Sequence, residues 1–539
     1  MSSQSEKLRI DDGSRWTFVG QRWNDESDGE LAVDESLRRV DGDAMQGHQY
    51  AFLNDKVFGN LTADFRFRLT PHSDVGLIVG AIDPAHFLVL HFPNCGQASR
   101  AQHFWATLSV MDDSGYLRVV KLELVQRVAS TNALWTDAHL EIVDGRIDVR
   151  IGRAGKFSVE HPDLGRQGRI GIYRFGSPGI RSVKVRGDSL PVTPWDTTET
   201  PPQNWLHPIP AGGDRLWQKP GQIVRTKGGD LLLGFLQQEP RWGDSTIPLI
   251  ARSTDNGRTW QTPLPMSAMK PEGWDGWGTI HVFPDGVLRM VISDESGCRL
   301  SVSDDDGRSW SKPVEMALPP PPDGVKRLHP APPTNLADGS VVIFGYGGHE
   351  SSLPAAVIHT WGSHHCQAYA TRTTDNGQTW SPWVNIDGTT ATDGTPGQGN
   401  LDFTEICCAQ TGDGDLMAFI RPIYSPWMWE TWSTDGGASW TPAVRGPFPG
   451  YATSNMLRMS SGAILVAHRM PGCTVHLSWD DGVTWDQGTM IDSAIWVMGG
   501  MVELEPDVAL YVYHDSFESL MRSQRIRVTS DGIEPIREG

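Results

Sequence analysis

The chain has 539 residues, of which 38% are hydrophobic and 21% charged, and its formal net charge is −19. This composition is ordinary for a soluble globular protein, and the length suffices for several hydrophobic cores. No run of about 18 apolar residues occurs, which excludes a membrane-spanning helix. The lack of a Lys/Arg-rich run argues against a nucleic-acid-binding surface. The negative charge would also repel a strongly anionic polymer unless a local basic pocket opposed it.

Six cysteines are too few for a disulfide scaffold, and no CxxC metal spacing is present. The adjacent pair Cys407 and Cys408 should point to opposite faces of a strand. The first residues, MSSQSEKLRIDDG, lack the apolar core of a signal peptide. Because free cysteines suit a reducing compartment, we expect a cytoplasmic protein; the alternative is a secreted protein whose leader has been removed.

Residues 1–190 alternate polar and apolar side chains in segments such as 62–69, 86–92, 117–125 and 138–152. This pattern predicts a β-sandwich with antiparallel pairing. The segment 191–213 follows, with six prolines between 191 and 210, and it is typical of a stiff linker. The third predicted part is 214–539, so the fold class is all-β throughout.

One octet recurs five times in the third part, with the form [S/T]-x-D-x-G-x-[S/T]-W. The copies are 253–260, 303–310, 373–380, 433–440 and 478–485. The Asp and Ser/Thr oxygens can bond turn amides, Gly supplies a positive φ, and Trp can pack beneath the turn. The octet therefore predicts a structural hairpin, and its aspartates are not counted as catalytic.

A second repeat, two strands joined by a tight turn, runs between the octets. Its six copies are 223–235, 280–292, 334–346, 406–420, 456–469 and 501–514, and 525–536 resembles a degenerate outer hairpin. Repeats of this kind cannot close a core alone, so the pattern predicts a six-bladed β-propeller.

The octets resemble the Asp boxes, or BNR repeats, of the sialidase-like superfamily. This resemblance covers about 214–535 and implies a six-bladed propeller and a glycoside-cleaving enzyme, although Asp boxes also occur in non-enzymatic propellers. The segments 135–147 and 168–187 more weakly resemble concanavalin-like jelly-roll domains. Such domains often bind sugars, and a structural role is an equal alternative.

Several site residues are implied by the same resemblance. The segment LDFTEICCAQTGDGDLMAFIRP (401–422) resembles the family's Glu strand, which assigns Glu405 and Arg421. GDSTIPLIARSTDNG (243–257) resembles the segment of the family's acid, which assigns Asp244. AHRMPG (467–472) resembles the segment of another family arginine, which assigns Arg469.

Two parts of the family pattern are missing. Gln218-Lys219-Pro220 stands where the family has its Arg-Ile-Pro motif, and the opening of blade six (494–501, AIWVMGGM) contains no tyrosine. Both groups adapt a sialidase to the carboxylate at the anomeric carbon of its substrate. We therefore expect a non-sialic or unusual acidic sugar.

Active residues of a propeller lie where the first strand of a blade begins or the second ends. This rule adds one candidate for substrate binding on each of five blades: Arg241, Trp274, His349, Asp402 and Trp496. The two tryptophans could stack on sugar faces. Glu405 and Asp244 would be the catalytic carboxylates, one donating a proton and the other attacking or activating water. No cofactor or metal is predicted, and the expected partner is an oligo- or polysaccharide.

Three alternatives stay open. The first is a true exo-sialidase with a displaced nucleophile, such as Tyr451. The second is a polysaccharide lyase that uses His/Tyr chemistry, for which His349, His468 and His514 are candidates. The third is a non-catalytic carbohydrate-binding propeller.

Overall fold

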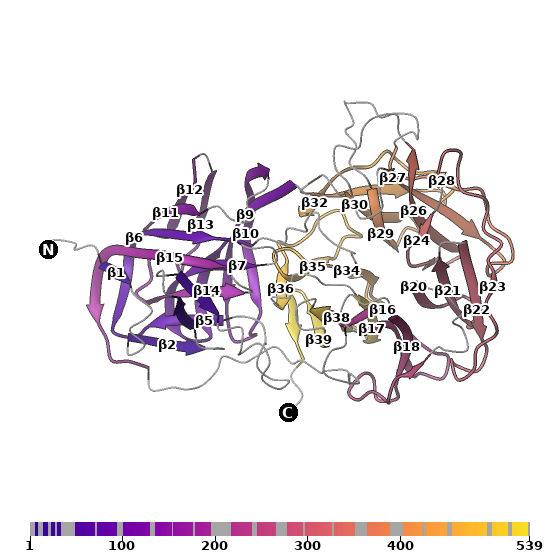
Figure 1. Cartoon of the computed structure of the whole chain (residues 1–539), viewed down its shortest axis with the longest axis horizontal. Helices are drawn as coiled ribbons and strands as arrows, with labels where there is room; N and C mark the ends of the chain where they lie inside the picture. The colour runs from indigo at the N-terminus through magenta and orange to yellow at the C-terminus, as the bar shows by residue number, and fades with distance from the viewer. Residues whose placement is uncertain are drawn as a thin grey trace. The chain divides into compact units, whose positions relative to one another are not determined.

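The structure is a computed structural model of the whole chain. It describes residues 6–536 except the segments 9–14, 20–22, 27–29, 34–48, 70–72, 94–100, 130–134, 154, 176–177, 196–216, 240–244, 266–276, 295–296, 326–327, 351–363, 389–402, 423–424, 426, 450–454, 493–498 and 516–519. No α-helix occurs in these ranges, and so none that could cross a membrane. The fold is all-β, as the sequence predicted (Figure 1).

The chain divides into two compact units. Unit 1 comprises Met1–Asn204, Met470–Thr474 and Gln487–Ile495, and unit 2 comprises Trp205–Arg469, Val475–Asp486 and Trp496–Gly539. Each unit has its own hydrophobic clusters.

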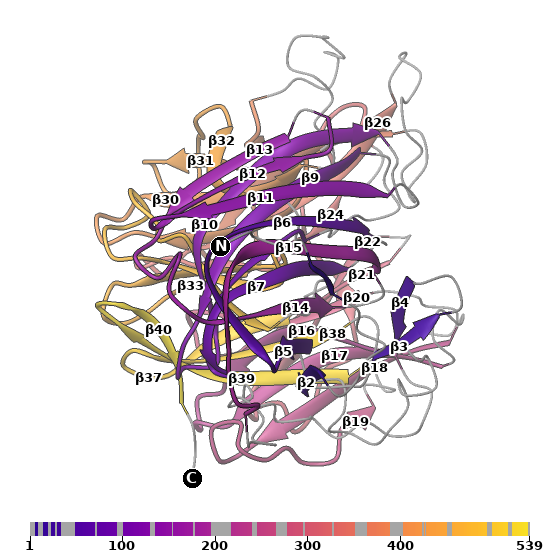
Figure 2. The ribbon, with the colours of Figure 1, turned by 90° about the vertical axis from the view of Figure 1, so that its left-hand side faces the viewer.

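Unit 1 is a sandwich of two antiparallel sheets, and Figure 2 shows its strands from the side. In order across the first sheet, the strands are β1 (Glu6–Leu8), β15 (Gly179–Pro191), β6 (Lys56–Arg68), β11 (Thr136–Val143), β12 (Arg146–Ile151) and β13 (Gly155–Glu160). The second sheet has β2 (Trp16–Val19), β5 (Gln49–Leu53), β14 (Arg169–Phe175), β7 (Asp74–Asp83), β8 (His86–His91), β9 (Ala101–Met111), β10 (Leu117–Ala129) and β36 (Thr489–Asp492). A separate hairpin joins β3 (Trp23–Glu26) to β4 (Glu30–Val33).

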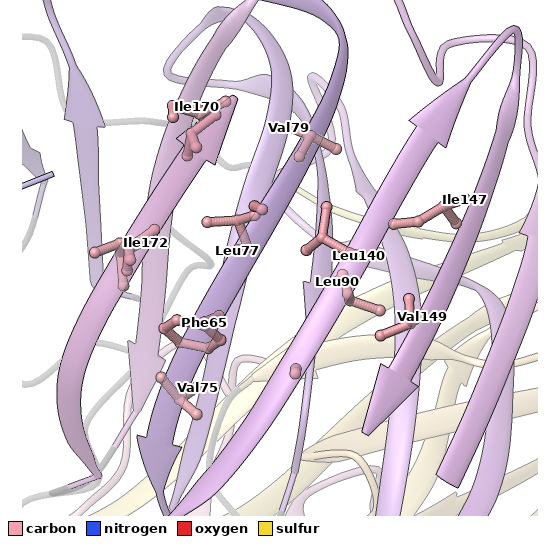
Figure 3. Close-up of a cluster of buried hydrophobic side chains, with 14 of the residues drawn as sticks. Phe65, Val75, Leu77, Val79, Leu90, Leu140, Ile147, Val149, Ile170 and Ile172 are labelled. Atoms are coloured by element: carbon pink, nitrogen blue, oxygen red, sulfur yellow. The ribbon is translucent and has the colours of Figure 1, made fainter. Parts of the chain in front are cut away.

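The sandwich core arises from period-two alternation. On β12 the burial pattern alternates strictly, so Ile147 and Val149 point inward while Arg146 and Asp148 face solvent. Figure 3 shows these two residues in the same apolar cluster as Leu77 of the opposite sheet. Burial of such side chains contributes roughly 25 cal/mol per Å² of apolar area, which stabilises the contact between the sheets.

Unit 2 contains six successive antiparallel blades. Blade one has β16 (Trp217–Arg225), β17 (Leu231–Glu239), β18 (Ser245–Ser253) and β19 (Leu264–Pro265); blade two has β20 (Trp277–Val282), β21 (Leu288–Asp294), β22 (Gly297–Ser303) and β23 (Val314–Glu315). Blade three has β24 (His329–Pro330), β25 (Thr334–Asn335), β26 (Val341–Glu350), β27 (His364–Thr373) and β28 (Val384–Asn385); blade four has β29 (Phe403–Gln410), β30 (Leu416–Pro422), β31 (Trp427–Ser433) and β32 (Val444–Pro449). Blade five has β33 (Asn455–Arg458), β34 (Ile464–His468) and β35 (Cys473–Ser478), and blade six has β37 (Gly499–Glu505), β38 (Val508–Asp515), β39 (Leu520–Thr529) and β40 (Gly532–Pro535).

The blades form a closed ring. β16 of blade one contacts both β20 of blade two and β37 of blade six. A Cβ atom at Gly500 would lie 2.8 Å from the backbone nitrogen of Ile223, so a side chain at this position of β37 would collide with β16. The adjacent cysteines follow the predicted alternation: Cys407 packs with blade five and Cys408 with blade three.

The Asp boxes are structural turns, as the sequence predicted. In the third box, Thr373 Oγ1 and the Thr379 amide donate to Asp375 Oδ1 at 2.7 and 2.9 Å, and Thr379 Oγ1 donates to Oδ2 at 2.5 Å. These donors, above all the Thr379 hydroxyl, lower the pKa of Asp375 to about 2. The φ angles of Asn376 and Gly377 are 57° and 89°, so two successive residues are left-handed where the sequence indicated one.

Two strands need separate mention. β36 is the neighbour of β35 in the sheet order and so the fourth strand of blade five, although it is grouped with unit 1 and also pairs with β10 through Leu117↔Met490. The inner strand of blade three is split into β24 and β25, which both pair with β26. Pro332 and Pro333 lie between the two pieces, and proline cannot donate to the ladder.

Candidate functional site

The described part of the candidate site lies on the first hairpin of blade four. β29 and β30 pair from Phe403↔Pro422 to Gln410↔Leu416, and the turn between them closes with the Thr411 amide donating to the Asp415 carbonyl at 2.8 Å. Gly414 has a φ of 94° in this turn. Glu405, near the start of β29, and Arg421, near the end of β30, therefore lie at the same end of the blade.

A β-bulge sets the position of Glu405. Thr404 pairs with Arg421 and Ile406 with Ile420, which leaves Glu405 as the extra residue on β29. The Thr404 hydroxyl donates to the Arg421 carbonyl oxygen at 3.2 Å. A bulge redirects a side chain and is common beside active sites. The bulge separates the side chain of Glu405 from the regular alternation of β29.

Glu405 and Arg421 form an ion pair, in which Arg421 Nη1 donates to Glu405 Oε2. The arginine side chain is 8% exposed and the carboxylate side chain 21% exposed. The arginine thus serves as the buried anchor, while part of the carboxylate faces solvent. This geometry provides a fixed anion with an accessible edge, and the same contact would also arise in a purely structural pair.

Arg469 directly follows β34 and is only 2% exposed. The preceding His468 is fully buried, and its ring lies parallel to those of Phe448 and His476, at centroid distances of 5.3 and 4.8 Å. Burial, reinforced by the neighbouring His476, lowers the pKa of His468 well below its usual value. His468, a candidate in the lyase alternative, is therefore packed among rings.

The other predicted site residues are not placed. Asp244, the predicted acid, lies outside the described residues. So do four predicted substrate-binding residues and the alternative nucleophile: Arg241, Trp274, Asp402, Trp496 and Tyr451. His349 is described in its backbone, where it pairs with His365 on β27. Their roles remain predictions.

A polar network in unit 1 had no signal in the sequence. His91 Nδ1 lies 2.6 Å from Asp74 Oδ2, and His91 Nε2 lies 3.0 Å from Ser109 Oγ. The three residues come from β7, β8 and β9 and are at most 1% exposed. Burial raises the pKa of Asp74, against the opposing effect of His91. Although the order Asp–His–Ser resembles a catalytic triad, no substrate could reach this serine in the folded sandwich.

No group of three or more His, Cys, Asp or Glu side chains within the described ranges is arranged to hold a metal ion. The candidate site as described is thus a carboxylate with an arginine, and it offers acid–base or anion-binding chemistry.

Comparisons with known proteins agree with the repeats. Residues 275–494 match the family described as BNR repeat-like domain. Among solved structures, the Hadza microbial sialidase Hz136 is 16% identical with a TM-score of 0.48, covering 91% of this chain and 97% of that one. The NanB sialidase from Streptococcus pneumoniae is 11% identical with a TM-score of 0.44, covering 94% and 97%. A protein of unknown function from Dyadobacter fermentans is 14% identical with a TM-score of 0.48, covering 62% and 99%.

Likenesses of this size to solved structures do not specify a substrate. The family match instead covers four of the five Asp boxes and the Glu405 hairpin. On the family match and the five Asp-box turns within a six-bladed ring, residues 275–494 of this chain carry a BNR repeat-like domain.

Proposed function

We propose that this protein is an exo-acting glycoside hydrolase that cleaves a glycosidic bond of a non-sialic or unusual acidic sugar. The observation that carries the proposal is the bulge at Glu405, which holds a partly exposed carboxylate against Arg421 where the inner strand of blade four begins. Such a fixed carboxylate is one half of the pair that glycoside hydrolysis requires.

The proposed reaction uses two carboxyl groups. Asp244, as the acid, donates its proton to the glycosidic oxygen, and the bond from that oxygen to the anomeric carbon breaks. Glu405, as the anion, either attacks the anomeric carbon or takes a proton from the attacking water. Water supplies the hydroxyl of the released sugar, and the acid regains its proton, so the cycle needs no cofactor.

The acidic substrate follows from the arginines. Arg421 and Arg469 are the two family arginines that the sequence retains, and a guanidinium can bind a carboxylate through two parallel hydrogen bonds. The first family arginine and the tyrosine are replaced, which removes the groups that adapt a sialidase to a carboxylate on the anomeric carbon. A sugar acid with its carboxylate elsewhere on the ring suits the remaining set.

The test is turnover of fluorogenic aryl glycosides of hexuronic acids, sialic acid and neutral hexoses. We expect release from a hexuronide, and we expect Glu405→Gln to lose at least about 10²-fold in kcat while still binding product. The matched control is Glu430→Gln, which changes a half-buried carboxylate on β31 of the same blade. Activity of Glu405→Gln within a few-fold of wild type, in a folded protein, would place the chemistry elsewhere.

The competing function is a non-catalytic carbohydrate-binding propeller, and the ion pair itself favours it. A buried arginine on β30 needs a counter-charge, and Glu405 on the neighbouring strand supplies one without any reaction. In that case no glycoside is cleaved, and Glu405→Gln changes stability alone. A lyase would instead release an unsaturated product that absorbs in the ultraviolet.

A further inference from the structure

Blade four carries a second basic group on its outer strand. The Arg445 guanidinium lies over the ring of Trp427, with 3.8 Å between its central carbon and the ring centroid. Arg445 is exposed, and Trp427 is half-buried. The pair is therefore a cation held on an aromatic surface and open to solvent.

Trp427 lies at the same end of the blade as Glu405 and Arg421. Ile420 pairs with Trp429, so the register of β30 and β31 brings Trp427 level with Pro422, next to Arg421. Phe403, which pairs with Pro422, contacts the Trp429 ring edge-on at 5.7 Å. Phe403 and Trp429 belong to one packed cluster, which fixes the end of the blade where Trp427 lies.

An irregularity in β32 brings Arg445 to this position. Trp427 pairs with Pro449 and Trp429 with Arg445, so three residues of β32 lie opposite the single residue Met428. Gly446 permits the close approach, because a Cβ there would lie 3.0 Å from the Met428 carbonyl oxygen. Phe448, buried in the same bulge, anchors it against Phe419 at 4.7 Å.

The charge around Arg445 is unusual for this chain. The chain has 65 acidic and 46 basic residues, so carboxylates outnumber cations. Arg289 also lies on an aromatic ring, but it donates to Asp285, and Lys121 pairs with Glu123. Among the described residues, Arg445 has the Trp427 ring as its partner. Stacking covers a face of the guanidinium and leaves its in-plane N–H donors directed outward.

We propose that Arg445 and Trp427 form a distal subsite for an anionic group of a longer saccharide, bound by the same blade that carries Glu405. The guanidinium would donate two parallel hydrogen bonds to a carboxylate or a sulfate, and the indole fixes its orientation. This subsite deepens the proposed function, on which it rests for the identity of the ligand.

The strand spacing gives the reach of this subsite. β29 and β32 are separated by three strand intervals of about 4.8 Å, so Arg445 lies roughly 14 Å from the inner strand that carries Glu405. A single sugar ring cannot contact both. The ligand must therefore extend over several sugar units, with an anion beyond the one at which cleavage occurs.

The test measures binding without turnover. In the full-length Glu405→Gln protein, affinity for dextran sulfate and for uncharged dextran is measured by calorimetry at low and moderate salt. We expect binding of dextran sulfate but not of dextran, and Arg445→Gln should weaken it about 10-fold, which corresponds to about 1.4 kcal/mol. Arg445→Lys should lose most of that affinity, because lysine keeps the charge but lacks the planar guanidinium that can donate two parallel hydrogen bonds.

The matched control is Arg527→Gln, which removes an exposed arginine from β39 of blade six. An equal loss in both arginine variants would indicate general charge attraction and overturn the subsite, as would the absence of binding to the Glu405→Gln protein in which Arg445 is intact. Unchanged melting temperatures show that each variant is folded. The hydrolase proposal fails on a different measurement, the turnover of Glu405→Gln, so the two outcomes are separate.

Discussion

The ion pair between Glu405 and Arg421 can be dissected by a double-mutant cycle. Arg421→Met removes the charge and keeps an apolar stem, Glu405→Gln keeps the size of the side chain, and the third variant combines both. The cycle isolates the coupling between the two groups from what each does alone. It therefore separates the structural value of the pair from its value in catalysis.

The burial of the two side chains determines how much free energy of unfolding each substitution should cost. Exposed ion pairs contribute about 0–1 kcal/mol, and breaking a fully buried pair costs about 3–5 kcal/mol. This pair lies between these limits, because the guanidinium is 8% and the carboxylate 21% exposed. We expect Glu405→Gln to lower the free energy of unfolding by about 2–3 kcal/mol, because it leaves a buried cation. Arg421→Met should lower it by about 1–2 kcal/mol, because it leaves a carboxylate that water can reach.

The assay is equilibrium denaturation in urea, together with turnover of the best glycoside substrate. From the free energies of unfolding, we expect a coupling energy of about 1–2 kcal/mol between the two side chains. Turnover should fall in every variant that lacks Glu405, whatever its stability. A coupling near zero would refute the reasoning from burial, because it would mean that the two charges are solvated independently.

Two further predictions concern the rest of the chain. Asp375→Ala should lower the free energy of unfolding, because the three hydrogen bonds that its carboxylate accepts are lost, whereas the exposed Thr374→Ala in the same turn should change it little. Equal values for the two variants in urea denaturation would contradict the structural role of Asp375. Burial alone would lower the pKa of His86, but the Asp83 and Asp113 carboxylates raise it. Its contribution to stability is then complete below the unfolded pKa of about 6.5 and is lost as pH rises through the higher folded pKa, so His86→Gln should remove this loss of stability above about pH 6.5.

The repeats made most of unit 2 predictable. The octet specifies its own turn through Ser/Thr, Asp and Gly, and each copy requires only residues within eight positions. Counting the hairpins between octets then gives the number of blades. These features are local, so a single sequence suffices to detect them.

The features that the sequence did not reveal depend on pairing between distant segments. The position of β36 on β10 depends on the free edge of a strand far away in the chain. The bulge at Glu405 is visible only as a shift in register against β30. The network of Asp74, His91 and Ser109 joins three strands that share no local motif. The family resemblance assigned both Glu405 and Arg421 to the site, but the bulge between them could not be predicted from the sequence.

The opening of blade six bears on the substrate. The family's tyrosine sits in this region, and here β37 begins with Gly499 and Gly500. A Cβ at Gly499 would clash with the Val512 carbonyl oxygen, and one at Gly500 would lie 2.8 Å from the Ile223 nitrogen, so a tyrosine cannot occupy either position without moving β38 or β16. The close packing that closes the ring thus excludes the aromatic nucleophile from the start of this strand. A neutral phenol suits attack beside an anomeric carboxylate, whereas Glu405 acting directly suits a sugar whose carboxylate lies elsewhere, which is why we favour an acidic sugar other than sialic acid.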